Sequence, residues 1–185
     1  MHNEIGRIID QAPAGSWLVD VGANIGRFTL QAARRGVNVL AFEPSWQHFS
    51  QLRIEAQTIR TSIIVALPVA LGDHWFQAGL AVTSNGNPGW NTIVPGFMPS
   101  GDIDHAEAVP VGRLDDLAMW VTAQPVCLVK IDVEGYELPV CAGGVRFLSA
   151  CRAPVIMEVA PAAGATRPHR TIGPTIPGTP GQLVL

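Results

Sequence analysis

Short runs of apolar residues, rich in valine, leucine and isoleucine, recur along the first 160 positions of the chain. Runs of this length and composition are typical of strands that are buried on both faces of a parallel sheet. The pattern therefore predicts five strands, at 17–21, 37–42, 63–69, 126–132 and 154–159.

Segments with the spacing of amphipathic helices lie between most of these runs. From 27 to 35 the apolar residues fall on one side, and a glycine closes the segment. Ser45 is suited to cap a second helix over 45–57. Two more helices are predicted at 114–121 and 137–148. Because strands and helices alternate, we expect an α/β fold with a mostly parallel sheet that is covered on both faces.

Two segments break the alternation. From 74 to 109 glycine, proline, asparagine and tryptophan interrupt the pattern, which indicates loops with short strands at most. From 160 onward prolines recur and acidic residues are absent, so we expect an extended or disordered tail. The sequence thus predicts one domain over 1–159 and a Pro/Gly-rich C-terminal tail over 160–185.

Composition and charge narrow the classes of partner. Apolar residues make up 48% of the 185 positions and charged residues 15%, which favours a folded core over disorder. A net charge of -3 gives no basis for binding nucleic acid or an anionic membrane. The N-terminus has no signal-peptide pattern, and the longest uncharged stretch, 75–101, is interrupted by glycines and prolines. We therefore expect a cytoplasmic protein without a membrane segment.

The first predicted strand ends in a glycine-containing turn. Gly22 lets the backbone approach a ligand closely, and Gly26 lets the next helix pack near the strand. Asp20 adds a negative charge, which would repel a pyrophosphate and attract a ligand that carries an ammonium group. Because open parallel sheets bind ligands beyond the carboxyl ends of their strands, this turn is a candidate ligand site.

Acidic residues also follow the next two strands. Glu43 stands where a carboxylate can accept two hydrogen bonds from a ribose diol, and bonds to a charged acceptor contribute about 1.5–3 kcal/mol each. Phe42 and Pro44 offer flat apolar surfaces for an adenine. Asp73 could accept a hydrogen bond from the adenine amino group. Together these residues favour a pocket for a positively charged nucleoside.

Three motifs resemble the FkbM family of S-adenosylmethionine-dependent methyltransferases: DVGANIG at 20–26, FEP at 42–44 and KIDVEGYE at 130–137. The third motif is the most specific to the family, and the resemblance covers roughly 16–159. It implies a Rossmann-like class I methyltransferase sheet with S-adenosyl-L-methionine as cofactor. It also implies methyl transfer to a hydroxyl of a sugar, polyketide or similar small molecule, so the expected partner is a small-molecule or glycan acceptor.

The resemblance places parts of the cofactor at particular strand ends. The methionine end would lie against the turn after the first strand, Glu43 would hold the ribose, and Asp73 would lie near the adenine. The predicted cofactor-binding residues are Asp20, Gly22, Ala23, Asn24, Gly26, Glu43, Pro44 and Asp73.

Asp132 and Glu134 are the candidate catalytic residues, because they end the fourth strand and face the expected methyl donor. Either carboxylate could remove the hydroxyl proton as the new bond forms. Two other interpretations stay open: Asp132 contacts the cofactor, and Glu134 caps the next helix together with Glu137. Asp132, Glu134 and Glu158 could form a metal site in principle, but the resemblance calls for none, and we predict none.

The sequence departs from this family pattern near both ends. Methyltransferases of this class finish the sheet with a final antiparallel strand pair, whereas the sequence after 159 becomes proline-rich, so we expect that pair to be missing. The exposed sheet edge would then offer a site for homodimer formation. The segment before Trp17 leaves little room for an N-terminal substrate-binding helix.

Two other functions stay open at this point. The chain could be a truncated, non-catalytic cofactor-binding or interaction domain, which would bind the cofactor without turnover. A nicotinamide-dependent oxidoreductase would require a Gly-x-Gly-x-x-Gly turn. Here Asn24 stands where that turn needs a glycine-rich approach, and Asp20 precedes it.

Overall fold

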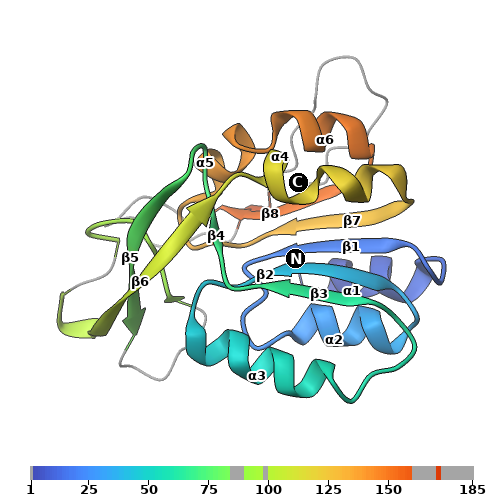
Figure 1. Ribbon diagram of the computed structural model, residues 1–185, viewed down its shortest axis with the longest axis horizontal. Coiled ribbons are helices and arrows are strands. Elements are labelled where there is room, and N and C mark those ends of the chain that lie inside the picture. The colour runs from blue at the N-terminus through green and yellow to red at the C-terminus, as the bar shows by residue number, and fades with distance from the viewer. Residues whose placement is uncertain (1, 84–89, 98–99, 160–169, 172–185) are drawn as a thin grey trace.

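A computed structural model describes residues 2–83, 90–97, 100–159 and 170–171. Within them, the central sheet has six strands in the order β3-β2-β1-β7-β8-β9 (Figure 1). The first five are parallel, and β9 pairs antiparallel with β8. The predicted α/β fold with a mostly parallel sheet is therefore confirmed. The strands are β1 (Trp17–Val21), β2 (Asn38–Phe42), β3 (Ile64–Leu67), β7 (Val126–Ile131), β8 (Val155–Val159) and β9 (Arg170–Thr171).

Helices cover both faces of this sheet. On one face lie α1 (His2–Gln11), α2 (Arg27–Arg34) and α3 (Trp46–Ala56). On the other lie α4 (Leu114–Ala118), a 3-10 helix (Met119–Ala123), α5 (Glu137–Ala142) and α6 (Val145–Cys151). In Figure 1, α2 and α3 are at the bottom of the view and α4 and α6 at the top. The sheet is thus the middle layer of three.

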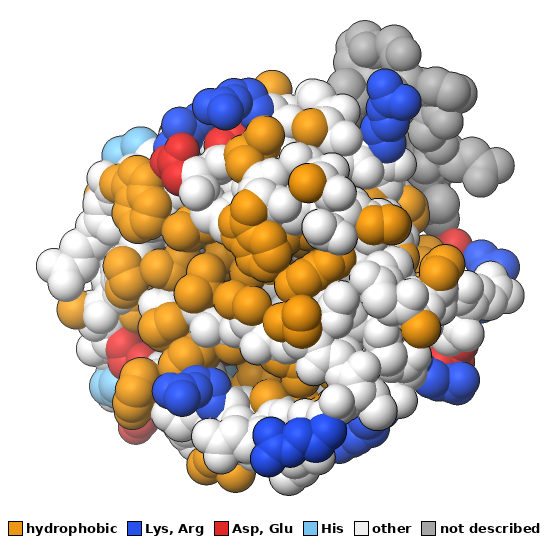
Figure 2. Space-filling view, turned by 45° about the vertical axis from the view of Figure 1, so that its right-hand side comes forward, with side chains coloured by type: hydrophobic (Ala, Val, Ile, Leu, Met, Phe, Trp, Pro, Cys, Tyr) orange, Lys and Arg blue, Asp and Glu red, His pale blue; other side chains and the backbone are white. Residues whose placement is uncertain are grey.

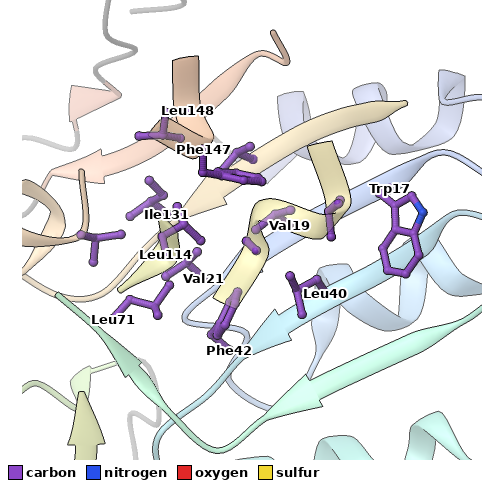
Figure 3. Close-up of a cluster of buried hydrophobic side chains, with 14 of the residues drawn as sticks. Trp17, Val19, Val21, Leu40, Phe42, Leu71, Leu114, Ile131, Phe147 and Leu148 are labelled. Atoms are coloured by element: carbon purple, nitrogen blue, oxygen red, sulfur yellow. The ribbon is translucent and has the colours of Figure 1, made fainter. Parts of the chain in front are cut away.

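Successive side chains of strand β1 point to opposite faces of the sheet. Because helices cover both faces, the strand is buried on both sides. Val19 and Val21 join a cluster with Phe42 and Phe147 beneath the second group of helices (Figure 3). Leu18 points the other way into a second cluster. Members of this second cluster from the helices include Ile5, Ile9, Phe28 and Leu52.

The N-terminal segment forms helix α1, for which the sequence analysis left little room. Ile5 and Ile9 are fully buried, and α1 packs against α2. Their spacing, with Ile8 between them, is the signal of an amphipathic helix. The segment before Trp17 therefore does have room for a helix, and this helix packs against the body of the fold.

The irregular segment contains longer strands than predicted. Strand β5 (Phe76–Thr83) pairs antiparallel with β6 (Ile103–Gly112), and the two-residue β4 (Ala70–Leu71) pairs parallel with β6. These strands form a second sheet in the order β4-β6-β5, which stands at the left of Figure 1. Leu80, Val109 and Val111 are buried in its apolar cluster.

Other differences concern boundaries. The predicted helix over 137–148 is two helices, α5 and α6, with Gly143 and Gly144 between them. Gly143 passes so close to the carbonyl oxygen of Gly72 that a Cβ there would collide with it. The predicted helix over 114–121 is α4 followed by the 3-10 helix. Of the predicted tail, the short strand β9 is described, and the rest lies outside the described residues. β9 covers the end of the β8 edge, where the sequence analysis expected the final strand pair to be missing.

Hydrophobic side chains gather in the middle of the face shown in Figure 2. Beside the first core cluster, Val65, Leu67 and Val69 are only partly buried, and Trp120 is 49% exposed.

In the part of the chain that the structure describes, no helix is both long enough and apolar enough to cross a membrane.

Candidate functional site

A cavity of about 550 Å³ lies at the carboxyl ends of β1, β2 and β7. Its volume is within the range of small-molecule sites, and its position is the one expected for a parallel sheet. Asp20, Gly26 and Asp73 are outside its lining. The predicted site residues that line it are Gly22, Ala23, Asn24, Glu43, Pro44, Asp132 and Glu134.

The turn after β1 is held tightly against the ends of its two neighbouring strands. The backbone N–H groups of Gly22 and Ala23 both donate to the Phe42 carbonyl oxygen at 3.0 Å. Gly22 has φ 75°, and a Cβ there would collide with the carbonyl oxygen of Asp132. Glycine is thus required at this position by both conformation and space.

Gly26 does not line the cavity but contributes to the packing of the helices. It has φ 91°, and a Cβ there would overlap the side chain of Leu52 in α3. The glycine therefore makes room for a side chain of α3, whereas the sequence predicted that it lets the next helix pack near the strand; it lies outside the cavity lining.

Glu43 borders the cavity, and backbone N–H groups hold both of its carboxylate oxygens. Its Oε2 accepts a 2.7 Å hydrogen bond from the Asn24 backbone N–H, and its Oε1 accepts one of 2.9 Å from Ser45. The side chain is buried, and burial raises its pKa to about 7 against the opposing effect of these two bonds. Within the described chain Ser45 does not cap α3 with its hydroxyl, which has no hydrogen-bond partner, while its backbone N–H donates to Glu43.

His48 accompanies Glu43 at the same side of the cavity. It projects from α3, is 7% exposed, and places Nδ1 3.9 Å from Glu43 Oε1. Burial lowers the pKa of this imidazole, so the neutral ring is favoured at physiological pH. The sequence analysis did not assign His48, because no local pattern distinguishes it from a surface residue of the helix.

Lys130, which is the one lysine of the sequence, is among the residues that line the cavity. It is 3% exposed, and its Nζ is 3.3 Å from Asp20 Oδ1 and 3.7 Å from Asp132 Oδ2. It also donates to the carbonyl oxygen of Gly22 at 2.5 Å. Burial alone would lower the pKa of this ammonium group, but the two carboxylates together raise it.

Asp20 is therefore not a lining residue, which corrects its predicted role. It is fully buried, pairs with Lys130, and accepts a 2.7 Å hydrogen bond from the Thr29 hydroxyl. The sequence predicted that the Asp20 carboxylate attracts the ammonium group of a ligand. In the structure the ammonium group beside this carboxylate is that of Lys130.

Asp132 and Glu134 both border the cavity. Burial raises the pKa of Asp132, although Lys130 opposes the shift. Glu134 has φ 51°, and its carbonyl oxygen accepts a 2.8 Å hydrogen bond from the Thr92 hydroxyl. Glu137 instead folds back on the turn and accepts hydrogen bonds from the backbone N–H groups of Gly135 and Val133. These two bonds hold the turn that precedes α5, so they do not amount to the predicted capping of the helix.

Asp73 lies away from the cavity, with its Oδ1 2.7 Å from Nδ1 of His74 and half of its side chain exposed. The reason is that β4 leaves the direction of β3 and pairs with β6, which carries Asp73 outward. Apolar residues line this part of the cavity in its place: Val69, Ala70, Leu71 and Leu80.

The cavity also contains residues that the sequence analysis left unassigned. They come mainly from α1, from the loop before β6 and from the turn after β7, and they include His2, Arg27, Asn91, Thr92 and Tyr136. Among the described residues, no group of three His, Cys, Asp or Glu side chains is placed to hold a metal ion.

Comparison with known proteins agrees with this geometry. The model of the Methyltransferase FkbM domain matches residues 20–171. A curated relative, Methyltransferase 1 of Beauveria bassiana (strain ARSEF 2860), is 34% identical over 149 residues, which are 71% of this chain and 59% of that protein. The chain thus spans about three fifths of the length of this relative.

A solved structure, that of Methyltransferase FkbM from Methylobacillus flagellatus KT, has a similar fold. It aligns with a TM-score of 0.53 at 20% identity, over 78% of this chain and 32% of that one. The likeness concerns the fold, whereas the domain match covers most of the sequence. On that match, the chain belongs to the FkbM methyltransferase domain family.

Proposed function

We propose that this chain binds S-adenosyl-L-methionine in the cavity at the strand ends and methylates a hydroxyl of a small molecule, such as a sugar or polyketide. The observation that carries the proposal is that the Gly22 turn, Glu43 and Asp132 border one cavity. The names of the relatives, both methyltransferases, support the same reaction class.

The lining fits a cationic nucleoside. Four carboxylate side chains line the cavity against two cations, Arg27 and Lys130, and the charge of Lys130 is offset by its ion pair with Asp20. The carboxylates are those of Glu43, Asp132, Glu134 and Glu158. Each oxygen of Glu43 accepts one backbone N–H, and a carboxylate oxygen can accept a second donor, which leaves capacity for a ribose diol. The apolar surfaces of Pro44 and its neighbours would hold the adenine.

When bound, S-adenosyl-L-methionine supplies a methyl group that is activated on a sulfonium. The chain must then align the acceptor oxygen with that carbon, and positioning of this kind can supply about 7–11 kcal/mol of the barrier. Asp132 or Glu134 would take the hydroxyl proton as the oxygen–carbon bond forms. The raised pKa of Asp132 suits this role, because a base works best when its pKa approaches the working pH.

Calorimetric titration with S-adenosylhomocysteine, combined with methyl-transfer assays on a panel of hydroxylated acceptors, tests the proposal. Asp132→Asn and Glu134→Gln should each bind S-adenosylhomocysteine within about threefold of the wild-type affinity. Whichever residue is the base should lose about 10²- to 10⁴-fold in kcat when replaced. Glu55→Gln removes a carboxylate that is 48% exposed and outside the cavity, so it should act like wild type.

The possible failures differ in meaning. A wild-type chain that binds S-adenosylhomocysteine but methylates no acceptor of the panel would favour the non-catalytic cofactor-binding domain. A wild-type chain that does not bind S-adenosylhomocysteine would refute the assignment of the cavity itself.

A further inference from the structure

A second cavity, of about 510 Å³, adjoins the first on the side of the smaller sheet. Strand β5, the loop over 92–96 and the turn after β7 form its walls. Among the described residues that line it, none is charged, and the polar side chains are those of Thr92 and Tyr136. The full lining is Phe76, Ala78, Gly79, Ala81, Thr92, Ile93, Val94, Pro95, Gly96, Ile103 and Tyr136.

Three residues, Thr92, Ile93 and Tyr136, line both cavities, so they form the wall that the cavities share. This wall is anchored on two sides. Thr92 exchanges backbone hydrogen bonds of 2.8 and 3.2 Å with Ala81 of β5, and its hydroxyl donates to the Glu134 carbonyl oxygen at 2.8 Å. The second cavity is therefore tied directly to the turn that carries a candidate base.

We propose that the second cavity holds the uncharged, largely apolar body of the methyl acceptor, while the acceptor hydroxyl reaches the first cavity beside Tyr136. This inference rests on the proposed function. A charged body would lose its hydration in the second cavity without gaining a partner of opposite charge, which disfavours phosphorylated or nucleotide-linked acceptors. An aromatic or aliphatic body gains from leaving water.

The wall also limits how a polyhydroxylated body could bind. The Thr92 hydroxyl already donates to Glu134 and accepts from the backbone N–H of Val94. This leaves the phenol of Tyr136 as the main side-chain hydrogen-bonding group that the described lining can offer to a ligand. The cavity thus favours a scaffold with one or two polar groups over a free sugar.

The probe for this inference is 2-naphthol, which is fluorescent, has an apolar body and carries one hydroxyl. Naphthalene-2-sulfonate is its charged counterpart, and methyl glucoside represents a polar acceptor. Fluorescence titration of the wild-type chain in the presence of S-adenosylhomocysteine should show binding of 2-naphthol, with the sulfonate and the glucoside at least about tenfold weaker.

The matched variants are Gly79→Leu and Gly101→Leu. A Cβ at either glycine meets no atom within 4 Å, but Gly79 lines the second cavity and Gly101 lines neither cavity. Gly79→Leu should weaken 2-naphthol binding about tenfold or more by filling the space, whereas Gly101→Leu should bind like wild type. Ile103→Lys, at a lining residue that is 37% exposed, provides a second test if Gly79→Leu does not fold.

The outcomes separate the two proposals. Absence of 2-naphthol binding, or equal binding to wild type and both cavity variants, would overturn the inference while leaving S-adenosylhomocysteine binding intact. If the wild-type chain does not bind S-adenosylhomocysteine, but binds 2-naphthol in a way that Gly79→Leu weakens, the proposed function is refuted. The second cavity would then remain as a site for an apolar ligand.

Discussion

Replacing Lys130 by methionine should destabilise the chain strongly. The Nζ atom lies 3.3 Å from Asp20 and 3.7 Å from Asp132, and Asp20 is fully buried. Methionine keeps most of the volume but leaves the Asp20 carboxylate without its counter-ion. Removing one partner of a buried pair typically costs about 3–5 kcal/mol. For a domain of this size each kcal/mol lowers Tm by about 2–4 °C, so Tm should fall by about 6–20 °C.

Thermal and urea unfolding, followed by circular dichroism, measure this change. The double variant Asp20→Asn with Lys130→Met removes both charges and keeps an oxygen for the Thr29 hydroxyl, so it should recover most of the lost stability. Arg34→Met is the surface control, since Arg34 is 60% exposed and pairs with Glu55 at 3.8 Å, and it should change stability by less than about 1 kcal/mol. A Lys130→Met variant as stable as this control would refute the reasoning.

Three further predictions concern Glu43 and Gly22, which both line the cavity. The pKa of Glu43 is raised to about 7, and a ribose diol donates hydrogen bonds to the ionised form. The affinity for S-adenosylhomocysteine, measured by calorimetry, should therefore fall about tenfold from pH 8 to pH 6. Glu43→Gln should abolish this pH dependence. Since the native state holds this proton more tightly than the unfolded state, wild-type stability should decline from about pH 4.5 to 7, and Glu43→Gln should flatten that slope. Gly22→Ala, which brings a methyl group onto the Asp132 carbonyl oxygen at φ 75°, should cost about 2 kcal/mol or more in urea unfolding, whereas Gly79→Ala should stay within about 1 kcal/mol. Affinity that does not vary with pH, or equal stability of the two alanine variants, would contradict these predictions.

The main sheet could be predicted because its central strands are buried on both faces. In β1 and β7 this produces apolar runs that are each interrupted by one charged residue, Asp20 or Lys130, and the residues that follow them lie at one edge of the sheet. For the same reason the Gly22 turn, Glu43 and Asp132 could be placed around one cavity from their positions alone.

The errors arise where partners are distant in the sequence or where two patterns compete. The charge of Asp20 is visible in the sequence, but its pairing with Lys130 depends on the register of β1 against β7. Strand β5 alternates apolar residues at Phe76, Ala78 and Leu80, yet the glycines and prolines nearby favoured a loop. The direction of β4, which removes Asp73 from the cavity, depends on that same unpredicted sheet.

The burial of Lys130 has a practical use in chemistry. Since the sequence holds one lysine and that side chain is 3% exposed, an acylating reagent can reach a lysine amine only when the residues packed around Lys130 move apart. Mass spectrometry of the peptide that carries residue 130 would therefore count such openings over time. Slower acylation with a bound ligand would report how well that ligand protects this side chain.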